Sequence, residues 1–490
     1  MQPGPPQCSK QSTVLPGGAA ELAHVPSRWK GVETTATHIN PEAIRSYDLR
    51  GVVGRQLDLG DARQLGLAYA SWVRARGLRR IAVGRDGRLS SPDLERALVA
   101  GLVAGGMLVH RIGVGPTPQL HFAVHAYGLD GGIMVTGSHN PREENGFKLM
   151  IGTEPVHGET LRALVMTSAS PASGGESRDF PVMEAYVSQL QAQVRAGRPT
   201  VVWDCGNGAV GALIKGLTRR LPGRHFLLNS RVDGRFPAHH PDPSIAANLR
   251  ELRTMVLAHE ADLGIAFDGD GDRLGVVDET GAIVWPDQVL LLLAAEVLQA
   301  APRACIVADV KSSRVLFEGV ARLGGRPVMA PSGYVRVRDA MRRERAPLAG
   351  EMSGHIFFAE CWQGTDDALF AAVRLLDCLG RAGRTLGAFR RSLPPTAATP
   401  DLRIPCADGR KEEVLRRVAE RLAIAGARPD TTDGLRVTEA DGWWLLRASG
   451  TEPKLTIRCE ATDECGLERL RQVVGGHLRA CGQEWDNKAS

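Results

Sequence analysis

The sequence has few cysteines for its length, and none of them has the spacing of a metal or disulfide site. Nine are scattered over 490 residues, an odd number, and no Cys-x-x-Cys pair occurs. A cysteine-based zinc site and a disulfide framework are therefore not expected. The default expectation is a protein of the reduced cytoplasm.

Long apolar runs are also lacking. The longest, residues 289–295, ends at Glu296, whereas a membrane-spanning helix needs about 18 or more apolar residues. The first residues, Met-Gln-Pro-Gly-Pro-Pro, have neither the charged start nor the apolar core of a signal peptide. We expect no association with a membrane.

Neither sign of charge is in large excess. The formal net charge is +5, from 60 lysines and arginines against 55 aspartates and glutamates, and no long basic run occurs, so nucleic acid is not an expected partner. The composition is that of an ordinary globular protein, 43% hydrophobic and 23% charged, with 56 glycines that indicate many loops. At roughly 100–200 residues per domain, the length allows about three or four domains.

From about residue 39 onwards, short β-type runs alternate with helical stretches. The run Arg80-Ile-Ala-Val, for example, comes shortly before Ser91-Pro-Asp-Leu, which opens with a helix cap signal. This alternation predicts an α/β protein with largely parallel sheets. Residues 1–38 are rich in Pro, Gly, Ser and Thr without sustained periodicity, which predicts a disordered extension.

Composition divides the remaining chain at two places. Residues 167–179 are rich in Ser, Ala and Gly, and residues 393–400 are rich in Pro, Thr and Ala, so both are predicted to be linkers. The sequence is compatible with a third break near residues 281–286. A smaller α+β piece follows residue 400.

Three aspartates separated by single glycines follow the apolar run 261–267. They are Asp268, Asp270 and Asp272, and in an extended segment their side chains would share one side while the glycines let the backbone curve. Three carboxylates suit Mg²⁺, which takes oxygen ligands and keeps positions for phosphate. Two other interpretations stay open: an aspartate-rich surface turn, and an EF-hand, although Arg273 stands where that motif needs glycine.

Ser138 lies in the run Thr136-Gly-Ser-His-Asn-Pro, directly after an apolar run. A phosphate on its hydroxyl would bring a charge near −2 and three acceptor oxygens, which suits a cation held by the three aspartates. The alternative is a serine that bonds only to nearby backbone; a hydrolase elbow does not fit, because Asn140 replaces the second glycine. Ser138 and His139 are not expected to interact, since neighbouring side chains on an extended segment point apart. Serine and metal together indicate phosphoryl transfer.

Three further runs have the composition of binding loops or turns. Arg447-Ala-Ser-Gly-Thr-Glu-Pro combines a forked cation, hydroxyls and a flexible glycine, as a phosphate-binding loop would. Gly350-Glu-Met-Ser-Gly-His offers a carboxylate, a hydroxyl and an imidazole to sugar hydroxyls. Each could also be an ordinary turn. Gly206-Asn-Gly-Ala-Val-Gly matches a dinucleotide fingerprint locally, but such a match alone is weak, and we interpret it as a tight strand-to-helix turn.

Taken in order, these runs resemble those of the α-D-phosphohexomutase superfamily, most closely its bacterial phosphomannomutase/phosphoglucomutase branch. The resemblance covers nearly everything after residue 38 and is carried by Tyr47-Asp-Leu-Arg-Gly, Gly84-Arg-Asp-Gly-Arg, Thr136-Gly-Ser-His-Asn-Pro, Asn145-Gly-Phe-Lys, the aspartate loop with Arg273, Gly350-Glu-Met-Ser-Gly-His and Arg447-Ala-Ser-Gly-Thr-Glu-Pro. It implies three similar mixed α/β domains and a small C-terminal α+β domain, like the TATA-binding protein, around a central cleft. The implied domain limits are 39–178 (phosphoserine loop), 179–282 (metal loop), 283–394 (sugar-specificity loop) and 395–490 (phosphate-binding loop).

The same resemblance implies the site residues. Ser138 would be the phosphoserine, with His139, Lys148 and Arg273 as the other catalytic residues. Ser138 and the three aspartates would bind one Mg²⁺ per chain. The implied substrate-binding residues are Tyr47, Arg50, Lys311, Tyr334, Glu351, Ser353, His355, Arg447, Ser449, Gly450 and Thr451.

The implied activity is that of an isomerase, the reversible conversion of hexose 1-phosphate to hexose 6-phosphate, for mannose and also for glucose. A phosphoserine and a hexose 1,6-bisphosphate, which is also the activator, would carry the phosphoryl group. The partners would be small sugar phosphates, and the chain would be a monomer or weak dimer. A phosphoglucosamine mutase and a sugar-phosphate phosphatase stay open as alternatives.

Two departures from the branch bear on the chemistry. Tyr334 stands where the branch typically has a histidine proposed for proton transfer, which leaves the general acid/base open. Gly450 stands where the branch often has asparagine, so the phosphate loop has one side-chain donor fewer.

Overall fold

The computed structural model describes residues 39–450 and 453–485, apart from the side chain of residue 408. The predicted extension 1–38 and Thr451 of the predicted phosphate-binding loop lie outside the described residues. None of the helices in the described residues combines the length and the hydrophobicity of a membrane span.

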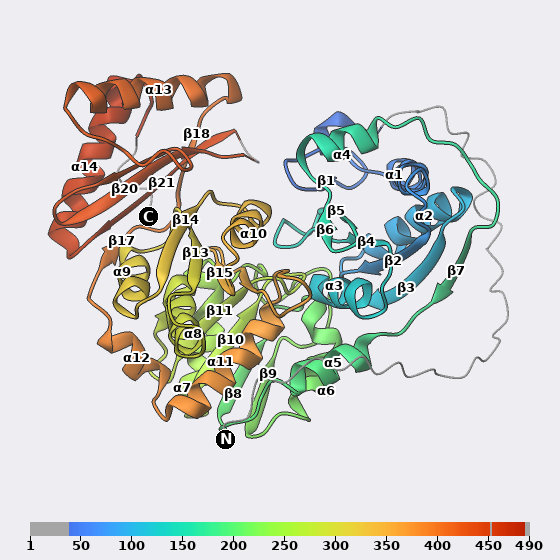
Figure 1. The fold of residues 1–490 in the computed structure, drawn as a ribbon, viewed down its shortest axis with the longest axis horizontal. Helices are drawn as coiled ribbons and strands as arrows, with labels where there is room; N and C mark the ends of the chain where they lie inside the picture. The colour runs from blue at the N-terminus through green and yellow to red at the C-terminus, as the bar shows by residue number, and fades with distance from the viewer. Residues whose placement is uncertain (1–38, 451–452, 486–490) are drawn as a thin grey trace. The chain divides into compact units, whose positions relative to one another are not determined.

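Four β-sheets follow one another along the described chain, coloured from blue to red in Figure 1, and the first three share a strand order. Each of these sheets contains four strands that are consecutive in the chain. Counted in chain order, they lie side by side as second, first, third and fourth: β3-β2-β4-β5, β9-β8-β10-β11 and β14-β13-β15-β16. The first three strands run parallel, and the fourth runs antiparallel to the third. The chain therefore contains three similar α/β units with mixed sheets, as the sequence predicts.

The first sheet adds β1 and β6 beside β5, and β7 beside β3. Its strands are β1 (Leu49–Val52), β2 (Arg80–Arg85), β3 (Leu108–Val114), β4 (Gly131–Val135), β5 (Glu144–Ile151), β6 (Glu154–Pro155) and β7 (Glu176–Asp179). The second sheet adds β12 beside β11 and consists of β8 (Thr200–Asp204), β9 (Arg224–Leu228), β10 (Leu263–Phe267), β11 (Leu274–Asp278) and β12 (Ile283–Val284). The third consists of β13 (Cys305–Asp309), β14 (Arg326–Ala330), β15 (Leu348–Gly350) and β16 (Ile356–Phe358).

Helices connect the strands of each unit. The first unit has η2 (Pro41–Ala43), α1 (Leu59–Arg74), α2 (Ser91–Ala104), α3 (Thr117–Ala126) and α4 (Gly158–Val165). The second has α5 (Met183–Gln191), η3 (Ala209–Ala212), α6 (Ile214–Thr218), η4 (Ala246–Leu249) and α7 (Arg250–Ala258). The third has α8 (Pro286–Ala300), α9 (Arg314–Arg322), α10 (Tyr334–Arg343), α11 (Ala368–Ala382) and α12 (Leu386–Ser392).

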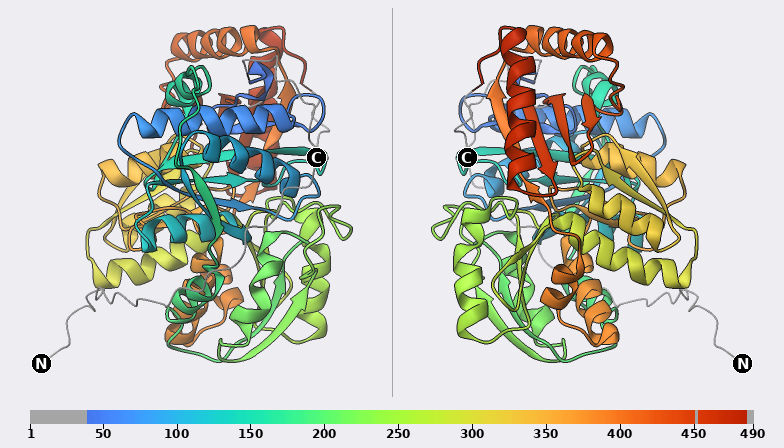
Figure 2. Two further views of the ribbon diagram at one scale, coloured as in Figure 1. Left: turned by 90° about the vertical axis from the view of Figure 1, so that its right-hand side faces the viewer. Right: turned by 90° about the vertical axis from the view of Figure 1, so that its left-hand side faces the viewer.

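The fourth sheet is smaller and antiparallel, with the order β17-β21-β20-β19 and β18 beside β21. Its elements are β17 (Ala397–Ala398), β18 (Leu402–Pro405), α13 (Asp408–Ile424), β19 (Leu435–Thr438), β20 (Gly442–Ala448), β21 (Lys454–Ala461) and α14 (Glu464–Ala480). Helix α14 packs on β20 and β21, and α13 packs on β20; Figure 2 shows α14 lying in front of the strands. This is the α+β piece predicted after residue 400.

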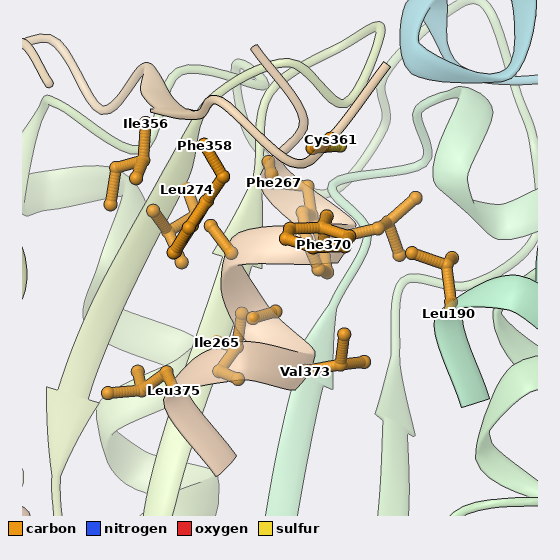
Figure 3. Packing of buried hydrophobic residues seen from close by; sticks show 14 of the residues in the cluster. Leu190, Ile265, Phe267, Leu274, Ile356, Phe358, Cys361, Phe370, Val373 and Leu375 are labelled. Carbon is orange, nitrogen blue, oxygen red and sulfur yellow. The ribbon is translucent and has the colours of Figure 1, made fainter. Parts of the chain in front are cut away.

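A shared apolar core joins the second and third units. Helix α11 follows the third sheet in sequence, yet its Phe370 and Val373 pack in one cluster with Ile265 and Phe267 of β10 (Figure 3). Phe370 also meets Phe358 of β16, with ring centroids 5.2 Å apart. Because every residue of β10 is buried, its apolar run needs cover on both faces, and α11 provides part of that cover.

Two segments predicted to be linkers contain edge strands. In the stretch 167–179, β7 pairs parallel with β3, and in the stretch 393–400, β17 pairs antiparallel with β21. All four side chains of β7 are exposed. These two strands were not predicted, because an edge strand is held by backbone hydrogen bonds to its neighbour, which leave no apolar pattern in the sequence.

Candidate active site

Three of the loops singled out in the sequence occupy one topological position in the three α/β units. Among the four strands that the three units share, each loop joins the third to the antiparallel fourth: residues 136–143 from β4 to β5, residues 268–273 from β10 to β11, and residues 351–355 from β15 to β16. The loops also meet, because Ser138 Oγ donates to Asp268 Oδ2 at 3.1 Å and Leu274 N donates to Gly354 O at 3.1 Å. Equivalent loops of the three units therefore supply side chains to one site.

Ser138 has a left-handed backbone conformation, with φ of 48°. Its N–H donates to Thr136 Oγ1 at 2.8 Å, and its buried hydroxyl faces Asp268. The turn also brings His139 Nδ1 to 3.2 Å from Ser138 Oγ. The prediction that these neighbouring side chains point apart is wrong, because it assumed an extended segment.

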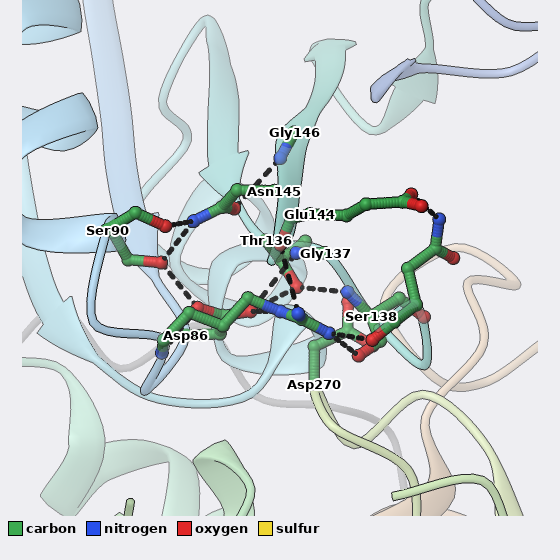
Figure 4. Close-up of polar contacts among 12 residues, drawn as sticks. Asp86, Ser90, Thr136, Gly137, Ser138, Glu144, Asn145, Gly146 and Asp270 are labelled. Atoms are coloured by element: carbon green, nitrogen blue, oxygen red, sulfur yellow. Dashed lines mark hydrogen bonds and ion pairs between the residues drawn. The ribbon is translucent and has the colours of Figure 1, made fainter. Parts of the chain in front are cut away.

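A buried aspartate at the end of β2 holds the serine loop (Figure 4). Asp86 Oδ2 accepts from Thr136 Oγ1 at 2.8 Å and from Gly137 N at 3.2 Å, and Asp86 Oδ1 accepts from Ser91 Oγ at 2.5 Å. Ser91 is the first residue of α2, and Ser90 occupies the N-cap position. The Ser91 hydroxyl therefore supports the serine loop and does not cap the helix, contrary to the cap signal in the sequence.

The three aspartates lie on a tight turn. Gly271 has φ of 71°, and Asp268 Oδ1 accepts from the backbone N–H groups of Asp272 and Arg273 at 3.1 and 3.2 Å. One oxygen from each of Asp268, Asp270 and Asp272 lies within 4.8 Å of the others, and all three residues are buried. The structure therefore brings the three together by a turn. The backbone curves at a glycine, as the sequence allows, and the segment is not extended.

Hydrogen bonding and charge in this cluster fit a cation. Asp270 Oδ1 and Asp272 Oδ1 are buried and accept no hydrogen bond from the described residues, although buried polar atoms are normally paired. Burial, together with the carboxylates of Asp272 and Asp270, raises the pKa of Asp268 well above its usual range. A divalent cation among these oxygens would satisfy the two acceptors and remove the repulsion.

Two donors from the first unit reach the cluster. Lys148 Nζ, on β5, donates to Asp270 Oδ2 at 2.7 Å and also to Asp272 Oδ2, and Thr117 Oγ1 donates to Asp270 Oδ2 at 2.6 Å. Burial alone would raise the pKa of Asp270, but Lys148 and Thr117 outweigh burial and hold that pKa below its usual range. The Asp270 carboxylate is therefore charged at neutral pH and can attract a cation.

The glycine-rich run after β8 supports the metal loop. Gly206 and Asn207 have positive φ angles of 50° and 57°, and the run leads into η3. A Cβ on Gly208 would lie 2.8 Å from Gly269 O, and Ala209 N donates to the same carbonyl at 2.9 Å. The run is a tight strand-to-helix turn packed against the metal loop, as interpreted from the sequence.

The third loop places Glu351 and His355 beside the metal loop. Glu351 Oε1 accepts from Gly333 N at 2.6 Å, and burial raises the pKa of Glu351. Arg273 Nε donates to His355 Nε2 at 2.9 Å, and His355 Nδ1 lies 2.7 Å from Asp366 Oδ2. Because Nε2 accepts a hydrogen bond, the ring proton belongs on Nδ1, on the side of Asp366.

This third loop is held in the same manner as the serine loop. Asp309, the last residue of β13, accepts from Met352 N at 3.1 Å through Oδ1 and from Ser332 Oγ at 2.7 Å through Oδ2. Asp86 and Asp309 therefore both stand at the end of the first strand of a unit and fix the loop after its third strand. Ser353 lies half-buried in the turn that Asp309 holds.

Arg50 and two tyrosines flank the first and third loops. Arg50 Nη1 donates to Asn140 Oδ1 at 2.6 Å. The rings of Tyr47 and Tyr334 pack edge to face with centroids 5.6 Å apart, and the Tyr334 ring lies 5.9 Å from that of His355. Burial raises the pKa of Tyr334 above its usual range, so its phenol is neutral at physiological pH.

Two predicted cations are paired with aspartates of the C-terminal part. Lys311 Nζ donates to Asp401 Oδ2 at 3.0 Å, and Arg447 Nε donates to Asp433 Oδ2 at 2.9 Å. Ser332 N donates to the same Asp433 oxygen at 3.0 Å. Asp433 therefore ties Arg447 to the segment that begins α10.

The end of β20 reaches the first unit. Gly450 O accepts from Ser46 Oγ at 2.7 Å, and Ser449 O accepts from Lys411 Nζ at 2.7 Å. Thr451, the next predicted residue, is outside the described residues. The described part of the predicted phosphate loop thus contacts the segment next to Tyr47.

A small pocket opens beside the aspartate cluster. Its lining includes Lys148 from the first unit, Asp272 from the second, and Tyr334 and Asp366 from the third. Side chains from three units therefore share one accessible space.

Comparison with known families matches four successive domains along the chain. The phosphoglucomutase/phosphomannomutase alpha/beta/alpha domains I, II and III match residues 41–164, 184–281 and 285–397, and the C-terminal domain of that family matches residues 402–474. The chain belongs to the phosphoglucomutase/phosphomannomutase family.

Relatives within the family match over almost their whole length. A phosphomannomutase/phosphoglucomutase of Pseudomonas aeruginosa is 41% identical over 441 residues, which are 89% of this chain and 95% of the relative. A phosphoglucomutase of Neisseria gonorrhoeae is 39% identical over 441 residues, 88% of this chain and 96% of the relative. The crystal structure of a phosphoglucomutase/phosphomannomutase family protein from Burkholderia thailandensis is 38% identical, with a TM-score of 0.84, and the match covers 91% of this chain and 98% of that one.

Some polar residues of this phosphoglucomutase/phosphomannomutase site had no predicted role. Thr117 contacts a residue 153 positions away, so no local pattern identifies it. Asp366 is one of two adjacent aspartates before α11, and that pair is its only sequence signal. Asp86 and Arg88 lie in the run Gly84-Arg-Asp-Gly-Arg, which contributes to the family resemblance without indicating what either side chain does.

Proposed function

We propose that the chain is a phosphomannomutase/phosphoglucomutase, an isomerase that interconverts the 1-phosphates and 6-phosphates of mannose and glucose. The observation that carries this proposal is the Ser138 hydroxyl, 3.1 Å from a carboxylate of a buried cluster of three aspartates. A serine that carries a phosphoryl group is stabilised by a cation beside it, and the cluster fits one. The names of relatives at 41% and 39% identity support the same activity.

In the proposed reaction, phosphorylated Ser138 gives its phosphoryl group to a hydroxyl of the bound hexose phosphate. The P–O bond to Ser138 breaks as a bond to the sugar oxygen forms, which produces a hexose 1,6-bisphosphate. The sugar hydroxyl gives up its proton in this step, and Ser138 Oγ takes up one proton to become a free hydroxyl. This intermediate turns around in the site, and Ser138 takes back the phosphoryl group at the other end of the sugar. The enzyme is unchanged after one cycle, and added bisphosphate acts as activator because it phosphorylates free Ser138.

Three side chains near Ser138 are proposed to assist the transfer. Burial is the main cause that holds the pKa of His139 well below its usual range, and the positive charge of Arg273 lowers it further. The imidazole is therefore neutral, and at 3.2 Å it is placed to hold the proton of the free serine hydroxyl. Lys148 and Arg273 would stabilise negative charge on the transferring group.

Ser138, Asp268, Asp270 and Asp272 are proposed to hold one Mg²⁺ per chain, because hard oxygen donors suit this ion. When bound, Mg²⁺ would supply positive charge beside the phosphoryl group. Lys148 already lies against two of the carboxylates and balances part of their charge.

The other predicted residues are proposed to bind the sugar phosphate in either orientation. Glu351 and Ser353 would hold the 3- and 4-hydroxyls, which glucose and mannose share, with His355 beside them. The phosphate that does not react would be bound by Arg447, Ser449, Gly450 and Thr451. The rest of the site would be lined by Tyr47, Arg50, Lys311 and Tyr334.

A paired assay on mannose 1-phosphate and glucose 1-phosphate, with Mg²⁺ and glucose 1,6-bisphosphate present, tests the proposal. We expect both sugars to give the 6-phosphate without release of inorganic phosphate. Turnover of glucosamine 6-phosphate, with neither hexose 1-phosphate used, would instead indicate a phosphoglucosamine mutase. Steady release of inorganic phosphate at the rate of isomerisation would indicate a phosphatase.

The substitution Glu351→Gln is expected to lower kcat/KM for both hexose 1-phosphates by roughly 10- to 100-fold, since a hydrogen bond to a charged group contributes about 1.5–3 kcal/mol. The glutamine can still accept from Gly333 N, so the loop should keep its shape. Glu360→Gln, which changes an exposed carboxylate paired with Arg374, is the matched control. Steady-state kinetics that do not distinguish Glu351→Gln from the wild type would contradict the sugar-binding role.

A further inference from the structure

Arg88 is buried against the serine loop, and four of its N–H groups donate to carbonyl groups of that loop and of Glu144, the residue that follows it. None of the Arg88 side chain is exposed. Nη1 donates to Pro141 O at 2.6 Å and to Glu144 O at 3.0 Å. Nη2 donates to Ser138 O at 2.8 Å and to Asn140 O at 2.7 Å. The guanidinium therefore fixes the loop along most of its length.

The fifth donor of Arg88 is also used. Arg88 Nε donates to Asp86 Oδ2 at 3.2 Å, the oxygen that also accepts from Thr136 Oγ1 and Gly137 N. A guanidinium has five N–H donors in a fixed fork, and here each of them has an acceptor. A lysine has three donors on one nitrogen and cannot reproduce this arrangement.

Backbone from two units closes around Arg88. A Cβ on Gly137 would lie 2.5 Å from Arg88 Cζ. In the second unit, a Cβ on Gly234 would lie 2.6 Å from Arg88 Cα, and the Phe236 ring centroid lies 5.1 Å from Arg88 Cζ. Arg88 is therefore packed between the serine loop and the unit that carries the metal loop.

These contacts bear directly on the backbone of Ser138. Its carbonyl accepts from Arg88 and also faces the metal loop, where a Cβ on Gly269 would lie 2.2 Å away. A positive φ is uncommon for a residue other than glycine and persists only where surrounding contacts impose it. Without the guanidinium, the Ser138 peptide could rotate and turn its hydroxyl away from Asp268.

We propose that Arg88 is a positioning residue for phosphoryl transfer: its guanidinium holds Ser138 in the conformation that directs Oγ toward Asp268. This inference rests on the proposed function. The four loop contacts of Arg88 are to backbone carbonyls, so its loss should slow the transfer step, measured by kcat, and leave the binding of sugar phosphate, reflected in KM, little changed.

The test compares Arg88→Lys and Arg88→Ala with the control Arg79→Lys, each in the full chain with glucose 1-phosphate as substrate. Arg79 also donates to backbone carbonyls, those of Gly106 and Gly174, but outside the serine loop. We expect kcat of Arg88→Lys to fall about 100-fold, since a misplacement of about 1 Å can have that effect, while Arg79→Lys keeps wild-type kinetics. Guanidinium ion added to Arg88→Ala should restore part of its activity, because it supplies the lost donors.

Several results would overturn the positioning role. These are a wild-type kcat for Arg88→Lys, a rise in KM as large as the fall in kcat, or folded Arg88→Ala that guanidinium does not reactivate. Thermal unfolding of both Arg88 variants below the assay temperature would also overturn it, because Arg88 would then be required for folding itself. An inactive wild type would reject the proposed function and this inference with it, whereas an active wild type with unaffected variants would reject the inference alone.

Discussion

Replacing Ser138 with alanine is expected to lower kcat for the interconversion of glucose 1-phosphate and glucose 6-phosphate by at least roughly 10³-fold. The substitution removes the oxygen that is proposed to carry the phosphoryl group, and no neighbouring group takes its place in that mechanism. The hydroxyl contacts Asp268 and His139, so its loss should not unfold the loop that Asp86 holds. A coupled assay for glucose 6-phosphate measures the effect.

Ser71→Ala is the matched control for this experiment. Ser71 lies in the same unit, on α1, and its hydroxyl bonds to the backbone of Ser170 away from the site. This variant should keep wild-type activity, and both variants should unfold near the wild-type temperature. Activity of folded Ser138→Ala comparable to that of the wild type would reject the phosphoserine mechanism.

Replacing Asp270 with asparagine is expected to weaken Mg²⁺ binding by at least about 100-fold. Loss of a side chain that only hydrogen-bonds to a metal ligand can already lower metal affinity by about that factor, and Asp270 is proposed to be a ligand itself. Asparagine has a similar shape and can still accept from Thr117 Oγ1, but it lacks the charge that Lys148 and a cation would share. Calorimetric titration with Mg²⁺ and the Mg²⁺ dependence of kcat measure the change.

The control for this substitution is Asp262→Asn. Asp262 is exposed at the opposite end of β10 and accepts from Thr200 N at 2.7 Å. Its substitution should leave the affinity for Mg²⁺ unaltered. An Asp270→Asn variant that binds Mg²⁺ as tightly as the wild type would show that the aspartate cluster does not hold the ion.

Local sequence was enough to find the loops of the site. The serine run follows the buried apolar strand β4, and the aspartate run follows the buried apolar strand β10. Each run therefore begins at the carboxyl end of the corresponding strand in its own sheet. Side chains placed directly after such strands collect at the carboxyl end of a parallel sheet, where ligands of α/β proteins bind. Residue type and position after the strand were therefore sufficient to nominate Ser138, Asp268, Asp270 and Asp272.

The conformation of these loops could not be predicted in the same way. Extended segments were assumed around Ser138 and Asp268, and both are turns. The turn at Ser138 depends on Asp86 and Arg88, which lie on another strand connection about fifty positions away in sequence. The edge strand β7 was missed for a related reason: its partner β3 is distant in sequence, and its own side chains are exposed.

In the proposed cycle, Ser138 donates a phosphoryl group to the sugar and then takes one back. This cycle can be followed by rapid quench with hexose 1,6-bisphosphate that carries radioactive phosphorus. We expect label to appear on the peptide containing Ser138 at least as fast as turnover, and unlabelled glucose 1-phosphate then to remove it into sugar phosphate. Label that never reaches Ser138, reaches it more slowly than turnover, or leaves as inorganic phosphate would rule out the phosphoserine cycle.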